Sequence, residues 1–282
     1  MAKRDRSTNQ NVVRKRMKED RGKGRGAEYH PWLHIQDVPS EGLVSRIKGW
    51  KNGRVYHLMS KLERRYFYIL EWSSQVIDVR EQFPLLPLEE TLAIAKGCGF
   101  QHPTDPQTKQ PVVMTTDFVI TLSSPSGSVD QARAIKPSSK LQSERTLEKL
   151  EIERRYWAVR KVDWGIVTER EIPAVIADNV ELLHSYLFVS DRFALTDAEV
   201  AAITSLLTRE VSQGQRPLRH IATDCDKALG FEPGTSLAFA YHLLASRQWI
   251  IDMNSPLNPG KKLSLLTTNV AAEEDQETGG IA

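Results

Sequence analysis

The chain has 282 residues, of which 40% are hydrophobic and 26% are charged. This length fits one or two compact domains, and the composition excludes a wholly disordered or fibrous protein. Two cysteines, Cys98 and Cys225, are far apart in the chain, so neither a disulfide framework nor a structural zinc site is expected. No stretch of the sequence has the 18 or so consecutive apolar residues of a membrane span, and no apolar segment follows the basic N-terminus. We therefore expect a cytoplasmic protein.

The net charge of +2 conceals an uneven distribution along the chain. Residues 1–26 carry ten Lys and Arg against three acidic residues, whereas residues 273–277 carry four acidic residues. Dense positive charge is what contact with DNA phosphates requires. A solvated extension without a specific role is an equally open interpretation. We expect a basic flexible arm over residues 1–28 and an acidic disordered tail over residues 269–282.

Residues 29–185 have the pattern of an α/β domain. Ser60 and Glu63 stand at the spacing of a capping box and predict the start of a helix that continues to residue 72. A second helix is expected over residues 144–159, and a Gly/Pro loop over residues 97–111. The β-branched and alternating runs that predict strands lie at residues 54–57, 76–80, 112–120, 132–136 and 164–168. Strands separated by helices predict a mixed sheet flanked by helices.

Residues 186–268 have a different pattern, with helices expected at residues 197–211, 218–229 and 234–247. Two strands follow at residues 248–253 and 263–267, joined by a loop that contains proline, glycine and lysine. Three short helices followed by such a hairpin indicate a winged-helix domain. An irregular helical cap is the alternative.

The residues with the clearest chemical meaning are Glu63 on a helix, Asp117 in a strand and Lys136 at the end of the next strand. Nucleases that use Mg²⁺ need carboxylates from separate elements to hold the ion, and a cation to hold the attacking water. This is also the plan of restriction-endonuclease-like folds. Asp is disfavoured inside strands, which points to a ligand at Asp117. The alternatives are a solvent-facing Asp117, a solvated strand-end lysine and a Glu63 that only caps its helix.

Glu153 is a further candidate because of its place on the predicted helix at residues 144–159. It lies between Leu150 and Trp157 on the apolar side of that helix. A carboxylate that faces a core is costly unless it is paired or bound to a metal ion. We expect Glu153 to join the acidic cluster of Asp117 and Glu63. An ion pair with Arg154, Arg155 or an arginine of the arm is the competing interpretation.

Several ordered blocks of this sequence resemble the TnsA family, the endonuclease subunits of heteromeric Tn-seven-type transposases. The resemblance extends from about Arg16 to Trp164, and the blocks that carry it lie at residues 62–72, 79–85, 116–118, 135–137 and 142–151. It implies a restriction-endonuclease-like domain followed by a C-terminal winged-helix domain. It also implies a DNA endonuclease that uses Mg²⁺, for which Mn²⁺ can substitute.

The resemblance further implies a division of labour at double-stranded transposon ends. The endonuclease would cut the 5′-end strand, and the DDE-type transposase subunit TnsB would process the 3′ ends. The AAA+ regulator TnsC would couple both proteins to a target-selection protein or an RNA-guided complex.

The resemblance places Glu63, Asp117 and Lys136 on the catalytic positions of the family. One residue departs from the pattern of such folds, because the position two before the lysine is Ala134, which cannot bind a cation. The expected metal ligands are therefore Glu63, Asp117, the carbonyl of Ile135 and Glu153, with water.

Two other function classes are also compatible with the sequence. The first is a non-catalytic winged-helix DNA-binding regulator, which the presence of Ala134 favours. The second is a stand-alone restriction or repair nuclease, which would cut DNA without partner subunits.

Overall fold

The computed structural model describes residues 7–38, 43–188 and 195–269. It divides into two compact units, Met1–Ala177 and Asp178–Ala282. The boundary falls inside helix α5 (Ala174–Leu183), slightly before the expected division at residue 185. Within the described ranges, no helix is both long and apolar enough to cross a membrane.

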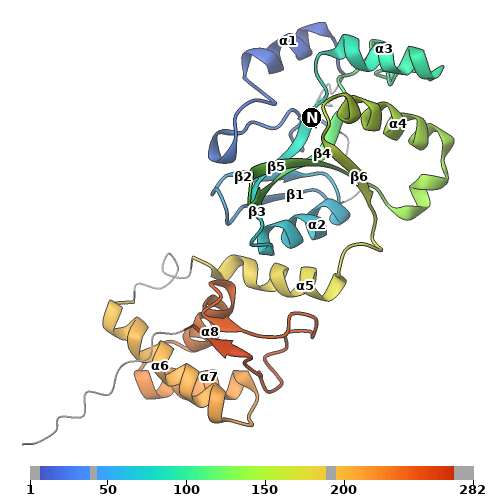
Figure 1. The fold of residues 1–282 in the computed structure, drawn as a ribbon. Coiled ribbons are helices and arrows are strands. Elements are labelled where there is room, and N and C mark those ends of the chain that lie inside the picture. Colours follow the sequence, from blue (N-terminus) through green and yellow to red (C-terminus); the bar gives the residue numbers. More distant parts are fainter. Residues whose placement is uncertain (1–6, 39–42, 189–194, 270–282) are drawn as a thin grey trace, which may run out of the picture. The chain divides into compact units, whose positions relative to one another are not determined.

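The first unit contains the larger sheet and the helices around it (Figure 1). Its helices are α1 (Gln10–Lys18), α2 (Lys61–Trp72), α3 (Leu88–Cys98) and α4 (Glu144–Val159), with the beginning of α5. Its strands are β1 (Ser45–Lys48), β2 (Val55–Leu58), β3 (Val76–Pro84), β4 (Thr115–Ser124), β5 (Gly127–Ile135) and β6 (Asp163–Val167). The β1–β2 pair forms a separate two-stranded sheet.

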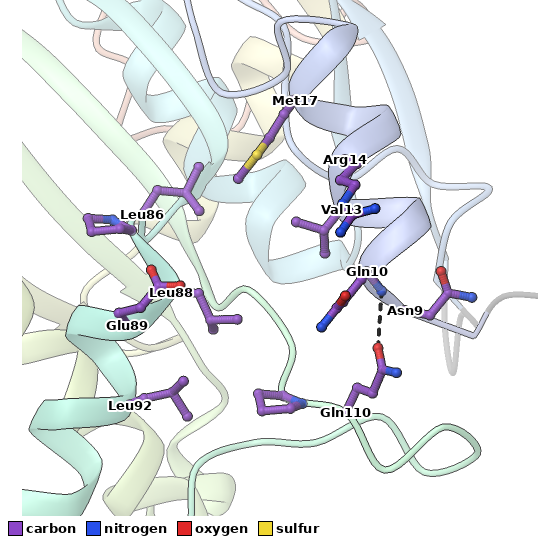
Figure 2. A pocket seen from close by; sticks show the side chains of 12 residues that line it. Asn9, Gln10, Val13, Arg14, Met17, Leu86, Leu88, Glu89, Leu92 and Gln110 are labelled. Atoms are coloured by element: carbon purple, nitrogen blue, oxygen red, sulfur yellow. Dashed lines mark hydrogen bonds between the residues drawn. The ribbon is translucent and has the colours of Figure 1, made fainter.

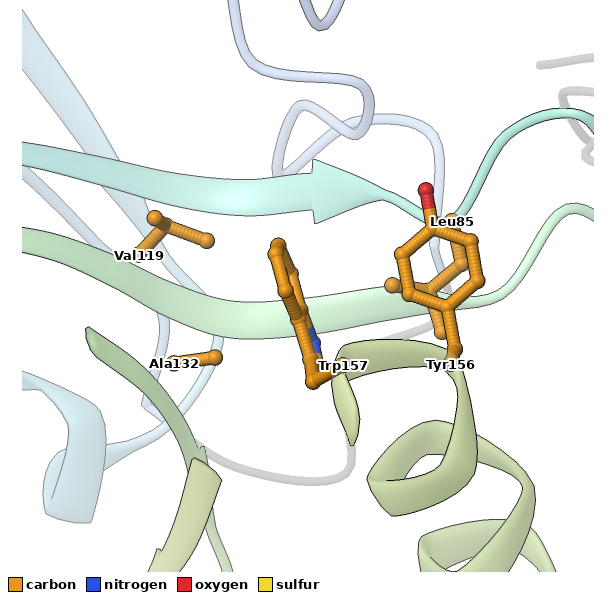
Figure 3. Close-up of a cluster of buried hydrophobic side chains, with 5 residues drawn as sticks. All are labelled: Leu85, Val119, Ala132, Tyr156 and Trp157. Atoms are coloured by element: carbon orange, nitrogen blue, oxygen red, sulfur yellow. The ribbon is translucent and has the colours of Figure 1, made fainter. Parts of the chain in front are cut away.

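The larger sheet has the strand order β3-β4-β5-β6. The first three strands are antiparallel, and β6 is parallel to β5 because α4 connects the two strands. Phe118 packs edge-on against Tyr66 of α2, whereas the next residue, Val119, packs with Trp157 of α4 (Figure 3). Consecutive strand residues point to opposite faces, so α2 and α4 cover opposite faces of this sheet. A mixed sheet flanked by helices in this order is the restriction-endonuclease-like fold, as predicted.

The start of α2 follows from local hydrogen bonding. The Ser60 hydroxyl accepts a hydrogen bond from the Glu63 backbone N–H at 3.1 Å, which satisfies one of the unpaired donors of the first turn. The Glu63 carboxylate in turn accepts bonds from the Ser60 hydroxyl and the Met59 backbone N–H. The first turn therefore holds the Glu63 side chain in one orientation.

The described part of the N-terminal arm is folded, which corrects the expectation of a flexible arm. Helix α1 is anchored at its start, where the Thr8 backbone N–H donates to the Asp105 carboxylate at 2.6 Å. Arg16 is buried, and its guanidinium lies 5.7 Å from the centre of the Trp32 ring. Arg21 donates to Asp37 at 2.7 Å. The expectation was wrong because some of the basic residues have structural partners.

Helices α1 and α3 face each other across an open groove of about 900 Å³ (Figure 2). The Gln10 backbone N–H donates to the Gln110 side chain at 3.0 Å at one end of the groove. Most of the lining is apolar and includes Val13, Met17, Leu86, Leu88 and Leu92. Helix α1 is therefore attached at its start and by Arg16, while the side that faces the groove is loosely packed.

Two glycines shape the turn that follows α1. Gly22 has φ +83° and Gly24 has φ +87°, conformations that residues with a Cβ rarely adopt. A Cβ at Gly22 would lie 2.3 Å from Pro84 Cγ, and one at Gly24 would lie 2.3 Å from the Glu28 carbonyl oxygen. Only glycine lets this turn pack on the end of β3.

The second unit contains the remainder of α5 and the helices α6 (Asp197–Gln213), α7 (Leu218–Leu229) and α8 (Thr235–Ala245). They are followed by the antiparallel strands β7 (Trp249–Ile250) and β8 (Thr267–Thr268). This is the element order expected of a winged helix, with strands shorter than expected. Much of the segment between the two strands is a loop that packs on α7. The carbonyls of Pro259 and Lys261 in this loop accept hydrogen bonds from the first backbone N–H groups of that helix.

Candidate active site

Asp117 and Lys136 meet where β4 and β5 separate. The regular pairing of these strands begins at Phe118 with Arg133, so Asp117 lies just beyond it. Its carboxylate oxygen Oδ2 accepts the Ile135 backbone N–H and the Lys136 ammonium, each at 2.7 Å. The other oxygen, Oδ1, accepts no hydrogen bond from the residues that the structure describes. The carboxylate therefore replaces a backbone acceptor and keeps one oxygen for a ligand.

Glu63 brings a second carboxylate to this region from α2. It is buried, and its oxygens accept hydrogen bonds from Met59 N–H at 2.8 Å and the Ser60 hydroxyl at 2.9 Å. Burial and then the nearby charge of Asp117 raise the pKa of Glu63 to about 7. The residue therefore both stabilises the start of its helix and interacts electrostatically with Asp117.

Glu153 lies in α4 and faces the same acidic group. Its carboxylate oxygen Oε1 accepts hydrogen bonds from the Thr116 hydroxyl at 2.7 Å and from the Trp164 indole at 3.0 Å. Burial and the charge of Asp117 raise the pKa of Glu153 to about 7.

The alternative of an ion pair between Glu153 and a neighbouring arginine is not what the structure shows. Arg154 and Arg155 instead bind Glu151, at 2.6 and 2.7 Å. The Glu153 carboxylate is left with uncharged hydrogen-bond donors.

Lys136 interacts with all three carboxylates. Burial lowers the pKa of its ammonium, but the charge and hydrogen bond of Asp117, followed by the charges of Glu153 and Glu63, raise this pKa above its usual value. The lysine therefore remains protonated at neutral pH. It partly offsets the negative charge that the three carboxylates bring together.

The available donors suit a hard divalent cation such as Mg²⁺, which prefers carboxylate, carbonyl and water oxygens. Among the described residues, no group of three His, Cys, Asp or Glu side chains could hold a metal ion. A cation would therefore need oxygens from the backbone or from water beside the carboxylates of Asp117 and Glu63. Ala134 is completely buried, so it leaves the usual ligand position without a donor.

Two residues around these carboxylates, Thr116 and Gln82, are not among the site residues that the sequence predicts. Thr116 donates to Glu153 and accepts a hydrogen bond from the Trp157 indole at 2.7 Å. Gln82 of β3 lies within 3.5 Å of Glu63. Thr is a common strand residue, so nothing in the sequence indicates that the Thr116 hydroxyl contacts Glu153. Gln82 follows two charged residues, Arg80 and Glu81, so its residue type gives no distinguishing signal either.

Comparison with known proteins places the chain in a family. A model of the TnsA-like endonuclease N terminal domain matches residues 73–169, and a model of the TnsA endonuclease C terminal domain matches residues 171–253. The first match includes Asp117, Lys136 and Glu153, whereas Glu63 precedes it. The chain is also 41% identical over 240 residues to the Transposon Tn7 transposition protein TnsA of Escherichia coli, a match that covers 84% of each chain.

The restriction-endonuclease-like fold defines the class of the first unit as nuclease-like. The two matched domains and the similarity across most of the chain show that this protein belongs to the TnsA endonuclease family. Membership implies an endonuclease role in transposition, and it confirms the resemblance inferred from the sequence.

Proposed function

We propose that this protein is the endonuclease subunit of a cut-and-paste transposase and hydrolyses the 5′-end strand at transposon ends with Mg²⁺. A DDE-type partner, TnsB, would process the 3′ ends. The observation that supports this function best is the electrostatic cluster of Glu63, Asp117 and Lys136 at the end of the mixed sheet. Such a cluster has the two chemical components that phosphodiester hydrolysis requires, namely oxygen ligands and a fixed cation.

In this proposal each residue has a separate role. Asp117 would contact Mg²⁺ through Oδ1, and Glu63 would add a second carboxylate oxygen, with the Ile135 carbonyl and water completing the set. Glu153 would contribute a contact through a water molecule, because no three carboxylates of the described residues could hold the ion together. When bound, Mg²⁺ would neutralise charge on the scissile phosphate; Mn²⁺ has the same ligand preference. The Lys136 ammonium would orient the attacking water and stabilise its deprotonated form.

The partners follow from the charge distribution and the family. Arg14, Lys15 and Lys18 are exposed on α1 and would contact the phosphates of double-stranded DNA. The second unit would engage the AAA+ regulator TnsC, which links the transposase to a target-selection protein or an RNA-guided complex.

The test is cleavage of a labelled transposon-end duplex in Mg²⁺, Mn²⁺ or Ca²⁺, with and without the partner subunits. We expect 5′-strand nicks in Mg²⁺ and Mn²⁺ that require the partners and are lost in Asp117→Ala. Cleavage by the protein alone would indicate a stand-alone nuclease. Binding without any cleavage would indicate the DNA-binding regulator that Ala134 favours.

A further inference from the structure

Gln82 has an unusual backbone for a residue inside a strand. Its φ is +49°, in the left-handed region that residues with a Cβ disfavour. Its neighbours in β3, Glu81 and Phe83, pair with Phe118 and Thr116 of β4, whereas Gln82 has no partner in the register. Asp117 lies between these two β4 residues. A strained backbone of this kind persists only where surrounding contacts impose it, and such residues cluster at functional sites.

Both ends of the Gln82 amide have fixed partners, although the side chain is buried. The Thr115 hydroxyl donates to Oε1 at 3.1 Å, and Nε2 donates to the Glu63 carboxylate at 3.5 Å. The Gln82 backbone carbonyl accepts the Trp32 N–H at 3.2 Å. Because Thr115 occupies the oxygen of the amide, the nitrogen is directed at Glu63.

The hydrogen bond from Gln82 to Glu63 comes from a different element than the other hydrogen bonds to this carboxylate. Met59 and Ser60 directly precede the first residue of α2, and Ser60 caps that helix. Gln82 belongs to β3, the strand paired with the one that carries Asp117. The amide of Gln82 therefore connects the carboxylate of the helix to the sheet.

We propose that Gln82 is a positioning residue that holds the Glu63 carboxylate toward Asp117, and that its left-handed backbone directs the amide to that carboxylate. This inference depends on the proposed function, because it assigns Glu63 a role in binding the metal ion. Residues that orient metal ligands in this way commonly change metal affinity by about 10-fold to 100-fold when they are removed.

The test uses the full-length protein and two variants of the Gln82 contact. Gln82→Gly removes the amide while it favours the observed backbone conformation, so the variant should fold. Thr115→Val keeps the side-chain shape but removes the donor that orients the amide. Lys161→Gly is the matched control, because Lys161 is exposed and also has a positive φ of 55°. Mn²⁺ affinity is measured by calorimetry without DNA, and nicking with the partner subunits present is then measured over a range of Mn²⁺ concentrations.

We expect Gln82→Gly to bind Mn²⁺ at least about tenfold more weakly, Thr115→Val to show a smaller loss, and the control to match the wild type. Nicking by Gln82→Gly should recover as Mn²⁺ is raised, with unchanged affinity for DNA, which loss of a merely structural contact would not produce. Wild-type Mn²⁺ affinity in Gln82→Gly would overturn the inference. If the wild type itself neither binds Mn²⁺ nor nicks DNA, the proposed function fails, and this inference fails with it.

Discussion

The Lys136 ammonium and the Ile135 backbone N–H donate to the same oxygen of Asp117, each at 2.7 Å. One oxygen of this carboxylate thus holds β5 and its terminal lysine in place. The other oxygen has no hydrogen-bond partner among the described residues. A single side chain in this way completes the strand pairing and offers an oxygen atom to a ligand.

Asp117→Ala should lower 5′-strand cleavage by more than about 100-fold, because it removes the proposed main metal ligand. Joining of the 3′ ends by the partner should continue, so that simple insertions are replaced by cointegrates. Gel analysis of transposition products measures both outcomes. Asp163→Ala, which alters an exposed carboxylate of β6, is the control. Products that remain simple insertions would contradict the assignment.

Lys136→Ala should reduce the single-turnover nicking rate by about 100-fold to 10,000-fold, since a methyl group cannot orient or stabilise the attacking water. Its binding to transposon-end DNA should be unchanged. Lys140→Ala tests for a general charge effect, because Lys140 is exposed in the segment that follows. A near wild-type rate for Lys136→Ala would show that this lysine only pairs with Asp117 in the folded protein and takes no part in catalysis.

Glu153 should make stability depend on pH in the absence of divalent metal. Its pKa rises from 4.5 to about 7 on folding, so the stability gained by protonation is present below pH 4.5 and is lost as the pH rises through 7. Glu153→Gln imitates the protonated form and should be more stable than the wild type at pH 8, by up to ~3 kcal/mol. The difference should largely disappear at pH 4. Urea unfolding at both pH values measures it, and a variant that is less stable at pH 8 would contradict this account.

The buried ion pair of Arg54 and Glu81 gives a test of stability away from the proposed chemistry. Arg54 donates to Glu81 Oε1 at 2.9 Å, and Glu81 is completely buried. Arg54→Ala leaves that carboxylate without its cation and should cost about 3–5 kcal/mol of the free energy of unfolding. Adding Glu81→Ala should recover part of the loss, which chemical unfolding of the single and double variants measures. Additive losses would show that the two residues act independently.

A chain that ends at residue 191 should keep a folded nuclease-like unit and lose the binding to TnsC that we propose for the second unit. This end point retains all of α5, which crosses the division between the units at Ala177. Circular dichroism reports the fold, and a binding assay with purified TnsC reports the interaction. Normal binding by the truncated protein would place the regulator contact on the first unit.

Sequence patterns predicted elements whose causes are local. Helix α4 has the predicted bounds because Ser143 caps it and its apolar residues repeat at helical spacing. Asp117 was predicted because Asp is disfavoured inside strands, and Lys136 because it lies at the end of the next strand, directly before Pro137.

Features that depend on distant contacts could not be predicted in this way. Helix α1 is held by Asp105, which is 97 residues from its partner Thr8. Glu153 was expected near Asp117, but its hydrogen bond with Thr116 was not. Thr116 is 37 residues from Glu153, and nothing nearby in the sequence indicates that the two are paired. The contact of Gln82 with Glu63 depends on a left-handed backbone that the residue type does not favour.

The two glycines of the turn after α1, Gly22 and Gly24, should tolerate substitution poorly for a structural reason. Any side chain at Gly22 or Gly24 would collide with Pro84 or with the Glu28 carbonyl. In a deep mutational scan selected for transposition, both positions should therefore be depleted of variants as strongly as Asp117. Genetic intolerance alone would place these glycines among the reactive residues. A parallel selection for protein abundance would separate the two groups, because the glycine variants should lose much more folded protein than the Asp117 variants.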